Sequence, residues 1–344
     1  MKRCVIFLSA LSACGAADVC KLPADARVAP RPAARTRNLI LVTIDGVRWQ
    51  EIFGAPCGQV MLVPNLRALG EAGVAVGRAT PMVSSGPKFV SLPGYREIVR
   101  GRASADCTDN ECAPLGEMTL LDDFDDVAVV ASWERIARVT PRSALVSAGR
   151  HGGNRRDELR VNARASRILD EGARSRAHPG YAGYRPDRYT AELALEVLRE
   201  RRPRFLWVAL GDTDEYAHRG NWRGYLASLR AADDLVGALW AQLGELGAYG
   251  AETTVVVPAD HGRADDFRDH GDAPESSRVW LIAAGGAVTP RGSVAAARRL
   301  RLADVAPSIR ALVSLPPRDP IADAGRPIDE LLPPAWMASY SSSR

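Results

Sequence analysis

The chain has 344 residues, of which 46% are hydrophobic and 25% are charged, with a formal net charge of +4. This length suits one large α/β domain or two smaller ones, and the composition excludes disordered and fibrous classes. The basic residues are scattered and form no stripe. We therefore expect no nucleic-acid binding beyond a nucleotide as one candidate for the small-molecule substrate.

The first 20 residues are typical of an export signal. A positively charged start precedes an apolar run at residues 5–11, which is far shorter than the roughly 18 residues that cross a bilayer. Residues 11–14 resemble a bacterial lipobox, which would make Cys14 a lipid-anchored first residue. Ordinary cleavage two or three residues later is the alternative. We expect a periplasmic or envelope protein with a linker at residues 21–37.

The cysteine positions agree with export. Cys107 and Cys112 flank a short polar loop that suits a local disulfide in an oxidising compartment. A metal site there is the alternative, but no histidine lies near it. Cys20 and Cys57 would complete an even count, although the sequence alone does not establish their pairing.

Apolar runs alternate with helical patterns along the rest of the chain. This alternation predicts an α/β fold, a doubly wound and mostly parallel sheet with helices on both faces. The predicted strands are at residues 38–45, 127–131, 205–210, 253–257 and 279–283, and the predicted helices at 64–71, 188–201, 222–246 and 302–313. We assign residues 38–315 to this domain, residues 149–186 to a polar cap or insertion, and residues 316–344 to a C-terminal tail.

Three short segments place carboxylates and imidazoles directly after predicted strands. They contain Asp45, the pair Asp214 and His218, and the pair Asp260 and His261, with His270 a little further on. Ligands of open α/β sheets bind beyond the carboxyl ends of the strands, and these residue types suit zinc or another divalent ion. For any one residue, a helix cap or a local hydrogen bond is the simpler interpretation, but the three segments together favour metal. Asp212 competes with Asp214, and the spacing of four to His218 favours Asp214.

Ser91 is the candidate nucleophile. It precedes Pro93, which fits the first turn of a helix, so Ser91 is expected at a helix N-terminus where an anion is favoured. A serine needs activation to attack, and metal coordination supplies it. A plain N-cap serine is the alternative.

The ordered set of segments resembles the alkaline phosphatase superfamily, particularly its type I phosphodiesterase/nucleotide pyrophosphatase-like branch. In that family an Asp after the first strand is followed by a Ser or Thr nucleophile, Asp-x-x-x-His, Asp-His-Gly and a further His, and residues 304–309 resemble its late helix. The resemblance implies two metal ions, most simply Zn²⁺, and a phosphoseryl intermediate on Ser91. It assigns one ion to Asp214, His218 and His270, and the other to Asp45, Asp260 and His261 together with Ser91.

The resemblance thus predicts a hydrolase of small phosphate esters. Arg48, Lys88 and Arg96 are near enough in sequence to contact a phosphoryl oxygen, or to be plain surface charges. Diesterase relatives often carry an Asn soon after the nucleophile or in a neighbouring loop, where it helps hold a non-bridging phosphoryl oxygen. No Asn follows Ser91 closely in this sequence. Monoesters, diesters and sulfate esters therefore stay open. So do a phosphotransferase or phosphomutase, and a catalytically silent metal-binding lipoprotein.

Overall fold

The computed structural model describes residues 35–54, 62–177, 181, 183–316, 318 and 323–334. The predicted signal, the linker up to residue 34, Cys14, Cys20 and Cys57 lie outside the described residues. Among the described residues, no helix has the length and apolar character needed to cross a membrane.

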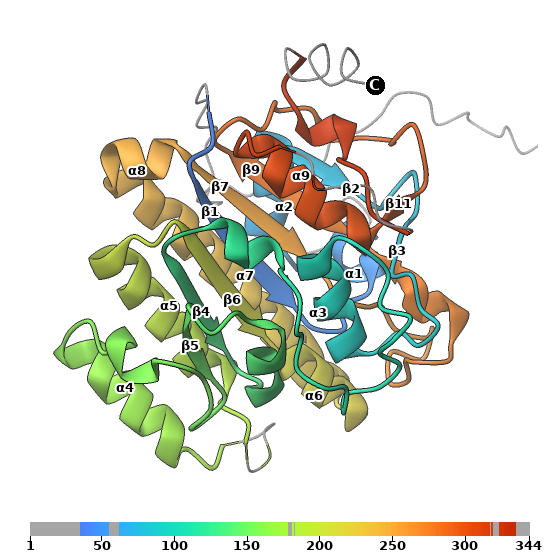
Figure 1. The fold of residues 1–344 in the computed structure, drawn as a ribbon. Coiled ribbons are helices and arrows are strands. Elements are labelled where there is room, and N and C mark those ends of the chain that lie inside the picture. The colour runs from blue at the N-terminus through green and yellow to red at the C-terminus, as the bar shows by residue number, and fades with distance from the viewer. Residues whose placement is uncertain are drawn as a thin grey trace, which may run out of the picture.

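The core of the described chain is an eight-stranded sheet in the order β10-β2-β9-β7-β1-β6-β4-β5 (Figure 1). β1 lies in the middle and pairs in parallel with both β6 and β7, while β9 runs antiparallel to β7 and β2. Because the central strands are covered on both faces, their residues are almost all buried apolar side chains. The strands are β1 Asn38–Ile44, β2 Val74–Val76, β4 Val127–Ala131, β5 Leu145–Ala148, β6 Phe205–Leu210, β7 Thr253–Pro258, β9 Leu281–Gly285 and β10 Gly292–Ser293.

A small three-stranded sheet, in the order β11-β3-β8, lies beside the large one. It consists of β3 Met82–Val83, β8 Arg278–Val279 and β11 Leu300–Arg301. These strands hold the segment before Ser91 against the segments that follow β7 and β9.

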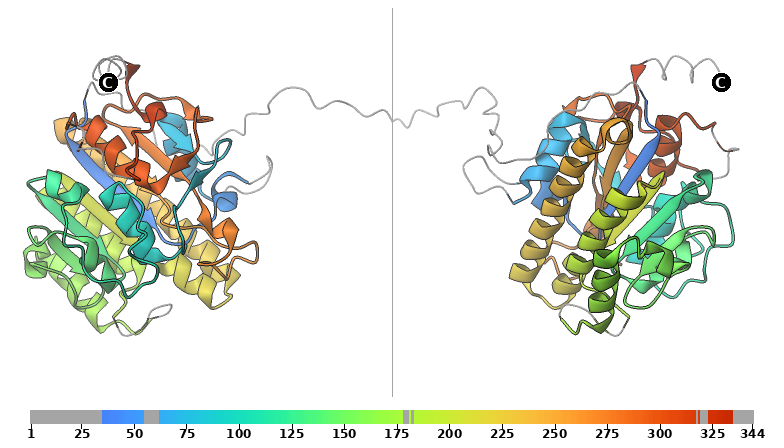
Figure 2. Two further views of the ribbon diagram at one scale, coloured as in Figure 1. Left: turned by 45° about the vertical axis from the view of Figure 1, so that its right-hand side comes forward. Right: turned by 90° about the vertical axis from the view of Figure 1, so that its left-hand side faces the viewer.

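Helices cover both faces of the large sheet (Figure 2). One layer contains α2, α7, α5 and α4, each in contact with the next, and the opposite layer contains α3 and α9. The helices are α1 Trp49–Phe53, α2 Pro64–Ala72, α3 Ser91–Arg100, α4 Ala163–Arg174, α5 Asp187–Arg201, α6 Asp212–His218, α7 Trp222–Glu245, α8 Gly247–Ala251 and α9 Val305–Leu312.

The predicted α/β class and the mostly parallel sheet are confirmed. Inside the predicted cap at residues 149–186, the structure has α4, whose apolar side packs on α5. Inside the predicted tail, Ile328, Leu331 and Leu332 are buried in the core. The division into domain, cap and tail stays a prediction.

Candidate metal centre

The candidate site lies where the three central strands end. β6, β1 and β7 are neighbours and parallel, so their carboxyl ends meet at one edge of the sheet. Asp45 follows β1, α6 with Asp214 and His218 follows β6, and Asp260 and His261 follow β7. The topology therefore brings together residues from segments far apart in the sequence.

We call Asp45, Asp260 and His261 the inner group. One ligand atom from each lies within 4.8 Å of the others, and all three residues are buried. His261 Nε2 is 3.2 Å from Asp45 Oδ1 and 3.6 Å from Asp260 Oδ2, while its Nδ1 is 2.8 Å from the Gly262 carbonyl oxygen. That carbonyl fixes the ring with Nε2 facing the two carboxylates.

The electrostatics of the inner group show a site that lacks positive charge. Burial and the neighbouring Asp45 carboxylate raise the pKa of Asp260 to about 8. Burial lowers the pKa of His261, but the carboxylates of Asp260 and Asp45 outweigh burial and raise this pKa to about 9. In the metal-free protein, protons therefore compensate charge that a divalent ion would otherwise compensate.

Ser91 reaches the inner group from α3. Its Oγ is 3.2 Å from Asp45 Oδ1 and 3.3 Å from His261 Nε2, and the residue is buried. Gly94 permits this approach, because a Cβ at that position would lie 2.4 Å from the Asp260 carbonyl oxygen. On the next turn of α3, the Tyr95 hydroxyl donates to Asp45 Oδ2 at 2.9 Å and so orients that carboxylate.

We call Asp214, His218 and His270 the outer group. His218 Nε2 lies 2.9 Å from Asp214 Oδ2 and 3.1 Å from His270 Nε2. His270 Nδ1 is 2.9 Å from the Phe89 carbonyl oxygen, which leaves its Nε2 toward the group. Burial, His261 and Arg263 lower the pKa of His270 to about 2, so this ring is neutral, as a metal ligand must be.

The inner and outer groups are in direct contact through His261. His261 Nε2 is 3.9 Å from Asp214 Oδ1, and the rings of His261 and His270 are stacked with centroids 4.3 Å apart. Asp214, His261 and His270 also place one ligand atom each within 4.8 Å of one another. The structure thus brings together all seven residues singled out from the sequence: Asp45, Ser91, Asp214, His218, Asp260, His261 and His270.

Arg263 is a buried cation beside Asp214, and the sequence alone gave it no role. Its guanidinium contacts Asp214 Oδ1 and donates to the Gly46 carbonyl oxygen at 3.0 Å and to the Arg268 carbonyl oxygen at 2.6 Å. Gly46 has φ of +61°, and a Cβ there would lie 2.7 Å from Asp214 Oδ1. Arg263 therefore ties the turn after β1 to Asp214 and leaves Asp214 Oδ2 toward His218.

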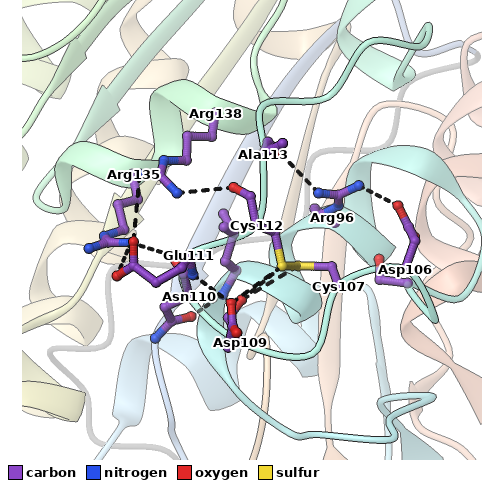
Figure 3. Close-up of a disulfide and its surroundings, with 12 residues drawn as sticks. Arg96, Asp106, Cys107, Asp109, Asn110, Glu111, Cys112, Ala113, Arg135 and Arg138 are labelled. Carbon is purple, nitrogen blue, oxygen red and sulfur yellow. Dashed lines mark hydrogen bonds and ion pairs between the residues drawn. A yellow bond between two sulfur atoms is a disulfide. The ribbon is translucent and has the colours of Figure 1, made fainter.

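Asn110 is the second residue that sequence reasoning missed. It lies on the loop closed by the Cys107–Cys112 disulfide, which the structure contains as predicted (Figure 3). The Leu92 backbone N–H, next to Ser91, donates to Asn110 Oδ1 at 2.9 Å. No Asn follows Ser91 closely in the sequence, but the disulfide loop brings Asn110 to the start of α3.

The remaining candidates point elsewhere. Asp212 Oδ1 accepts from the Tyr184 hydroxyl at 2.7 Å, and Asp212 belongs to neither group. Arg48 pairs with Glu51 at 2.5 Å, and Arg96 pairs with Asp106 at 2.6 Å. Lys88 forms an exposed ion pair with Asp272, two residues beyond His270.

The residues present fit divalent metal. Asp260 Oδ2 is buried and has no hydrogen-bond partner, although most buried polar atoms have one. A cation at the inner group would satisfy this oxygen. Carboxylate oxygens with imidazole nitrogens are donors typical of zinc sites, and the same donors also bind other divalent ions.

Residues 185–317 match the family described as the Metalloenzyme superfamily. A solved structure described as a protein in the alkaline phosphatase superfamily from Vibrio parahaemolyticus superposes with a TM-score of 0.60 at 15% identity, covering 88% of this chain and 72% of that one. The predicted resemblance to the alkaline phosphatase superfamily is confirmed. The similar proteins differ in their chemistry, as the next three show.

One is the phosphonate monoester hydrolase of Silicibacter pomeroyi, with a TM-score of 0.59 at 16% identity over 86% of this chain and 76% of that one. Another is a 2-O GAG sulfatase, with a TM-score of 0.58 at 14% identity over 87% of this chain and 74% of that one. At these identities the likeness concerns the fold.

A curated relative is the 2,3-bisphosphoglycerate-independent phosphoglycerate mutase of Thermomicrobium roseum, 28% identical over 134 residues. The match covers 36% of this chain and spans only about a quarter (24%) of that relative. It falls short of a whole-protein correspondence, so the activity of the mutase does not transfer directly.

Proposed function

We propose that this protein is a metal-dependent hydrolase of phosphoric esters with Ser91 as its nucleophile. The observation that carries the proposal is the position of the Ser91 hydroxyl. Its Oγ lies within 3.3 Å of both Asp45 Oδ1 and His261 Nε2, at the N-terminus of a ten-residue helix. A serine that only capped a helix would have no need of a buried carboxylate and imidazole.

The inner group and Ser91 would hold one divalent ion, and the outer group the second; we favour zinc for both. Two such ions, when bound, lower the pKa of a nucleophilic hydroxyl and offset the charge of a phosphoryl group. Tyr95 holds Asp45 in place, and Arg263 holds Asp214. These contacts keep the ligands oriented before substrate arrives.

The reaction on this chain is a double displacement. The Ser91 oxygen bonds to phosphorus as the bond to the leaving alcohol breaks, and the serine proton ends on the released alcohol. Water then hydrolyses the phosphoseryl group and regenerates the serine. The dipole of α3 directs partial positive charge toward the phosphoryl oxygens during both steps.

Asn110 favours diesters as the substrate class. Its Oδ1 accepts the Leu92 N–H, so its Nδ2 is the free donor, and no acceptor for it is seen within the part of the chain that the structure describes. An uncharged amide suits a diester, which carries one negative charge fewer than a monoester. We propose that Asn110 Nδ2 donates to a non-bridging phosphoryl oxygen.

The test is a zinc-loaded full-length protein assayed on bis-nitrophenyl phosphate, nitrophenyl phosphate and nitrophenyl sulfate, before and after a chelator. We expect turnover of the diester above the other two, lost with the chelator and restored by zinc. Ser91→Ala should lower the diester rate at least about 10³-fold while keeping the zinc content. Ser143→Ala, at an exposed serine, is the matched control and should behave as wild type.

Two results would redirect the proposal. Full activity in Ser91→Ala would remove Ser91 as nucleophile. Transfer of the phosphoryl group to an added alcohol in preference to water would favour the phosphotransferase or mutase, the class to which the curated relative belongs. A faster sulfate reaction would favour a sulfatase.

We also propose that the protein is exported to the bacterial envelope. The support is the signal-like start of the sequence, with Cys14 as the candidate lipid anchor. Disulfide formation at Cys107 and Cys112 agrees with an oxidising compartment.

A further inference from the structure

We infer that Arg263 is a positioning residue that divides the metal ligands between two ions. By occupying Asp214 Oδ1, its guanidinium keeps an ion from binding between the inner and outer groups. The inference rests on the proposed function, because it takes both groups as ion sites. It goes beyond that function in giving Arg263 the task of keeping the two ions apart.

Another set of ligands within the described residues crosses the two groups. Asp214, His261 and His270 each place one ligand atom within 4.8 Å of the others. Asp214 Oδ1 is 3.9 Å from His261 Nε2 and 3.8 Å from His270 Nε2. We call these three residues the crossing set. A carboxylate with two imidazoles at these distances suits a divalent ion by itself.

An ion in the crossing set would be incompatible with the two-ion arrangement. A neutral imidazole has one nitrogen that can bind metal, and in His261 this nitrogen is Nε2, because Nδ1 faces a backbone carbonyl oxygen. The same holds for His270. Each ring can therefore serve its own group or the crossing set, but not both. An ion in the crossing set would deprive the inner group, and Ser91 with it, of its histidine.

Arg263 opposes such an ion with a fixed positive charge. Its side chain has no exposed surface, and its Nη2 contacts Asp214 Oδ1 and lies 3.2 Å from the Asp214 carbonyl oxygen. Buried charges are poorly screened, so the guanidinium strongly repels a divalent ion at this oxygen. Asp214 Oδ2 is 2.9 Å from His218 Nε2 instead. One oxygen of the carboxylate thus belongs to Arg263 and the other to the outer group.

Hydrogen bonds to the backbone hold the guanidinium in this direction. Its Nε donates to the Gly46 carbonyl oxygen at 3.0 Å, and its Nη1 donates to the Arg268 carbonyl oxygen at 2.6 Å. Gly46 follows the inner ligand Asp45, and Arg268 stands two residues before the outer ligand His270. Because a guanidinium is a rigid planar fork, these two bonds also fix where Nη2 points.

The test is a zinc titration of the full-length protein that gives the number of bound ions and the affinity of each. Arg263→Met removes the charge and keeps an unbranched side chain, whereas Arg263→Lys keeps the charge. Arg268→Met, at an exposed arginine of the same loop, is the matched control. Circular dichroism establishes that each variant is folded.

Wild type, Arg263→Lys and Arg268→Met should each bind two equivalents of zinc. In Arg263→Met the first ion should enter the crossing set. The second should then bind at least about tenfold more weakly than in wild type, because the first has taken histidines that the second needs. Two ions bound with wild-type affinities in Arg263→Met would overturn the inference.

His218 distinguishes exclusion by charge from a general loosening of the site. The outer group uses His218, whereas the crossing set does not. His218→Ala should therefore weaken the outer ion when Arg263 is present. When it is added to Arg263→Met, the affinity for the first ion should stay within about twofold. A much weaker first ion in this double variant would show that the ion does not lie in the crossing set, and the inference would fail.

A measurement on wild type decides the inference even if Arg263→Met does not fold. Nuclear magnetic resonance of the histidine rings, with zinc added up to one equivalent, identifies the imidazoles that the ion binds. No singly loaded species should have both His261 and His270 bound. A species with both rings bound would place the ion in the crossing set despite Arg263 and would overturn the inference.

The two proposals fail separately. If the protein hydrolyses no ester, the proposed function fails, while the titrations and the histidine signals still decide the role of Arg263. If the wild type hydrolyses the diester and Arg263→Met keeps two ions at wild-type affinity, the role of Arg263 fails and the proposed function stands.

Discussion

The inner and outer groups use similar side chains in very different surroundings. Asp260 and His261 have no exposed surface, whereas the His218 side chain is 48% exposed. α3 lies against the inner group through Ser91, and the buried Asp260 Oδ2 there has no hydrogen-bond partner. The outer group opens to solvent through His218. The comparison teaches that burial, more than ligand type, decides how strongly each group depends on its ion.

This difference follows from elementary electrostatics. Two carboxylates buried side by side repel, and water cannot screen them, so they need a cation or protons. At the outer group, Arg263 already compensates Asp214, and water reaches His218. We therefore expect an ion in the inner group to be a structural and catalytic necessity, and an ion in the outer group to exchange more easily.

The largest effect is expected for Asp260→Asn. The change removes a negative charge and a ligand oxygen from the inner group while keeping the hydrogen bond from the Gly46 N–H, which is 3.1 Å long. Diester turnover should fall about 10³-fold or more, and one equivalent of zinc should be lost even at high zinc concentration. Metal analysis with kinetics checks it; retention of both ions would show that Asp260 is not a ligand.

A smaller, reversible effect is expected for His218→Ala. Removing an exposed ligand leaves Asp214 and His270 to hold the ion, so zinc affinity at the outer group should fall by at least the roughly 10- to 100-fold that loss of a ligand's hydrogen-bond partner costs. Turnover at low zinc should fall with it and recover as zinc is raised. If added zinc rescues Asp260→Asn but not His218→Ala, the contrast between the groups is reversed.

The smallest effect is a pH trend in the metal-free protein. The folded-state pKa of His261, about 9, is raised above its ordinary 6.5, and that of Asp260 is raised in the same direction. The His261 contribution to stability is therefore fully present below about pH 6.5 and lost as the pH rises through about 9. Chelated protein should show a Tm that decreases by a few degrees across this range.

Zinc should reverse that trend, because metal must displace the same protons and binds better as the pH rises. Thermal melts with chelator and with zinc, from pH 6.5 to 9, make the comparison. A metal-free Tm that increases over this range would contradict the assigned protonation of the inner group.

Much of the site could be predicted because its ligands follow long apolar strands. β1, β6 and β7 are strongly patterned, and the rule that ligands bind at strand ends then places Asp45, Asp214 and Asp260. The edge strands β5 and β10, and β2 next to β10, were missed, since runs of two to four residues carry little pattern. These short segments are strands only because they pair with neighbouring strands in the folded sheet.

Asn110 and Arg263 show what sequence patterns leave out. Asn110 is separated from Ser91 by the whole of α3 and reaches it only through a loop whose return path the disulfide defines. Arg263 stands in the Asp-His-Gly segment, but nothing in that segment tells that its side chain turns inward to Asp214. The roles of Asn110 and Arg263 depend on where their side chains point in the folded protein, and spacing along the chain does not encode this.

The place of β1 has a consequence for synthesis. Leu39 pairs with both Phe205 and Thr254, so β1, the first strand of the described chain to be made, is a central one, and both of its partners lie in the second half of the chain. At roughly 5–20 residues per second, the interval between Asp45 and His261 is on the order of ten to forty seconds. Until β6 is made, β1 has neither of its partner strands. During that interval the exposed apolar strand is an aggregation risk, and the inner group cannot form until His261, about three quarters of the way along the chain, has been made.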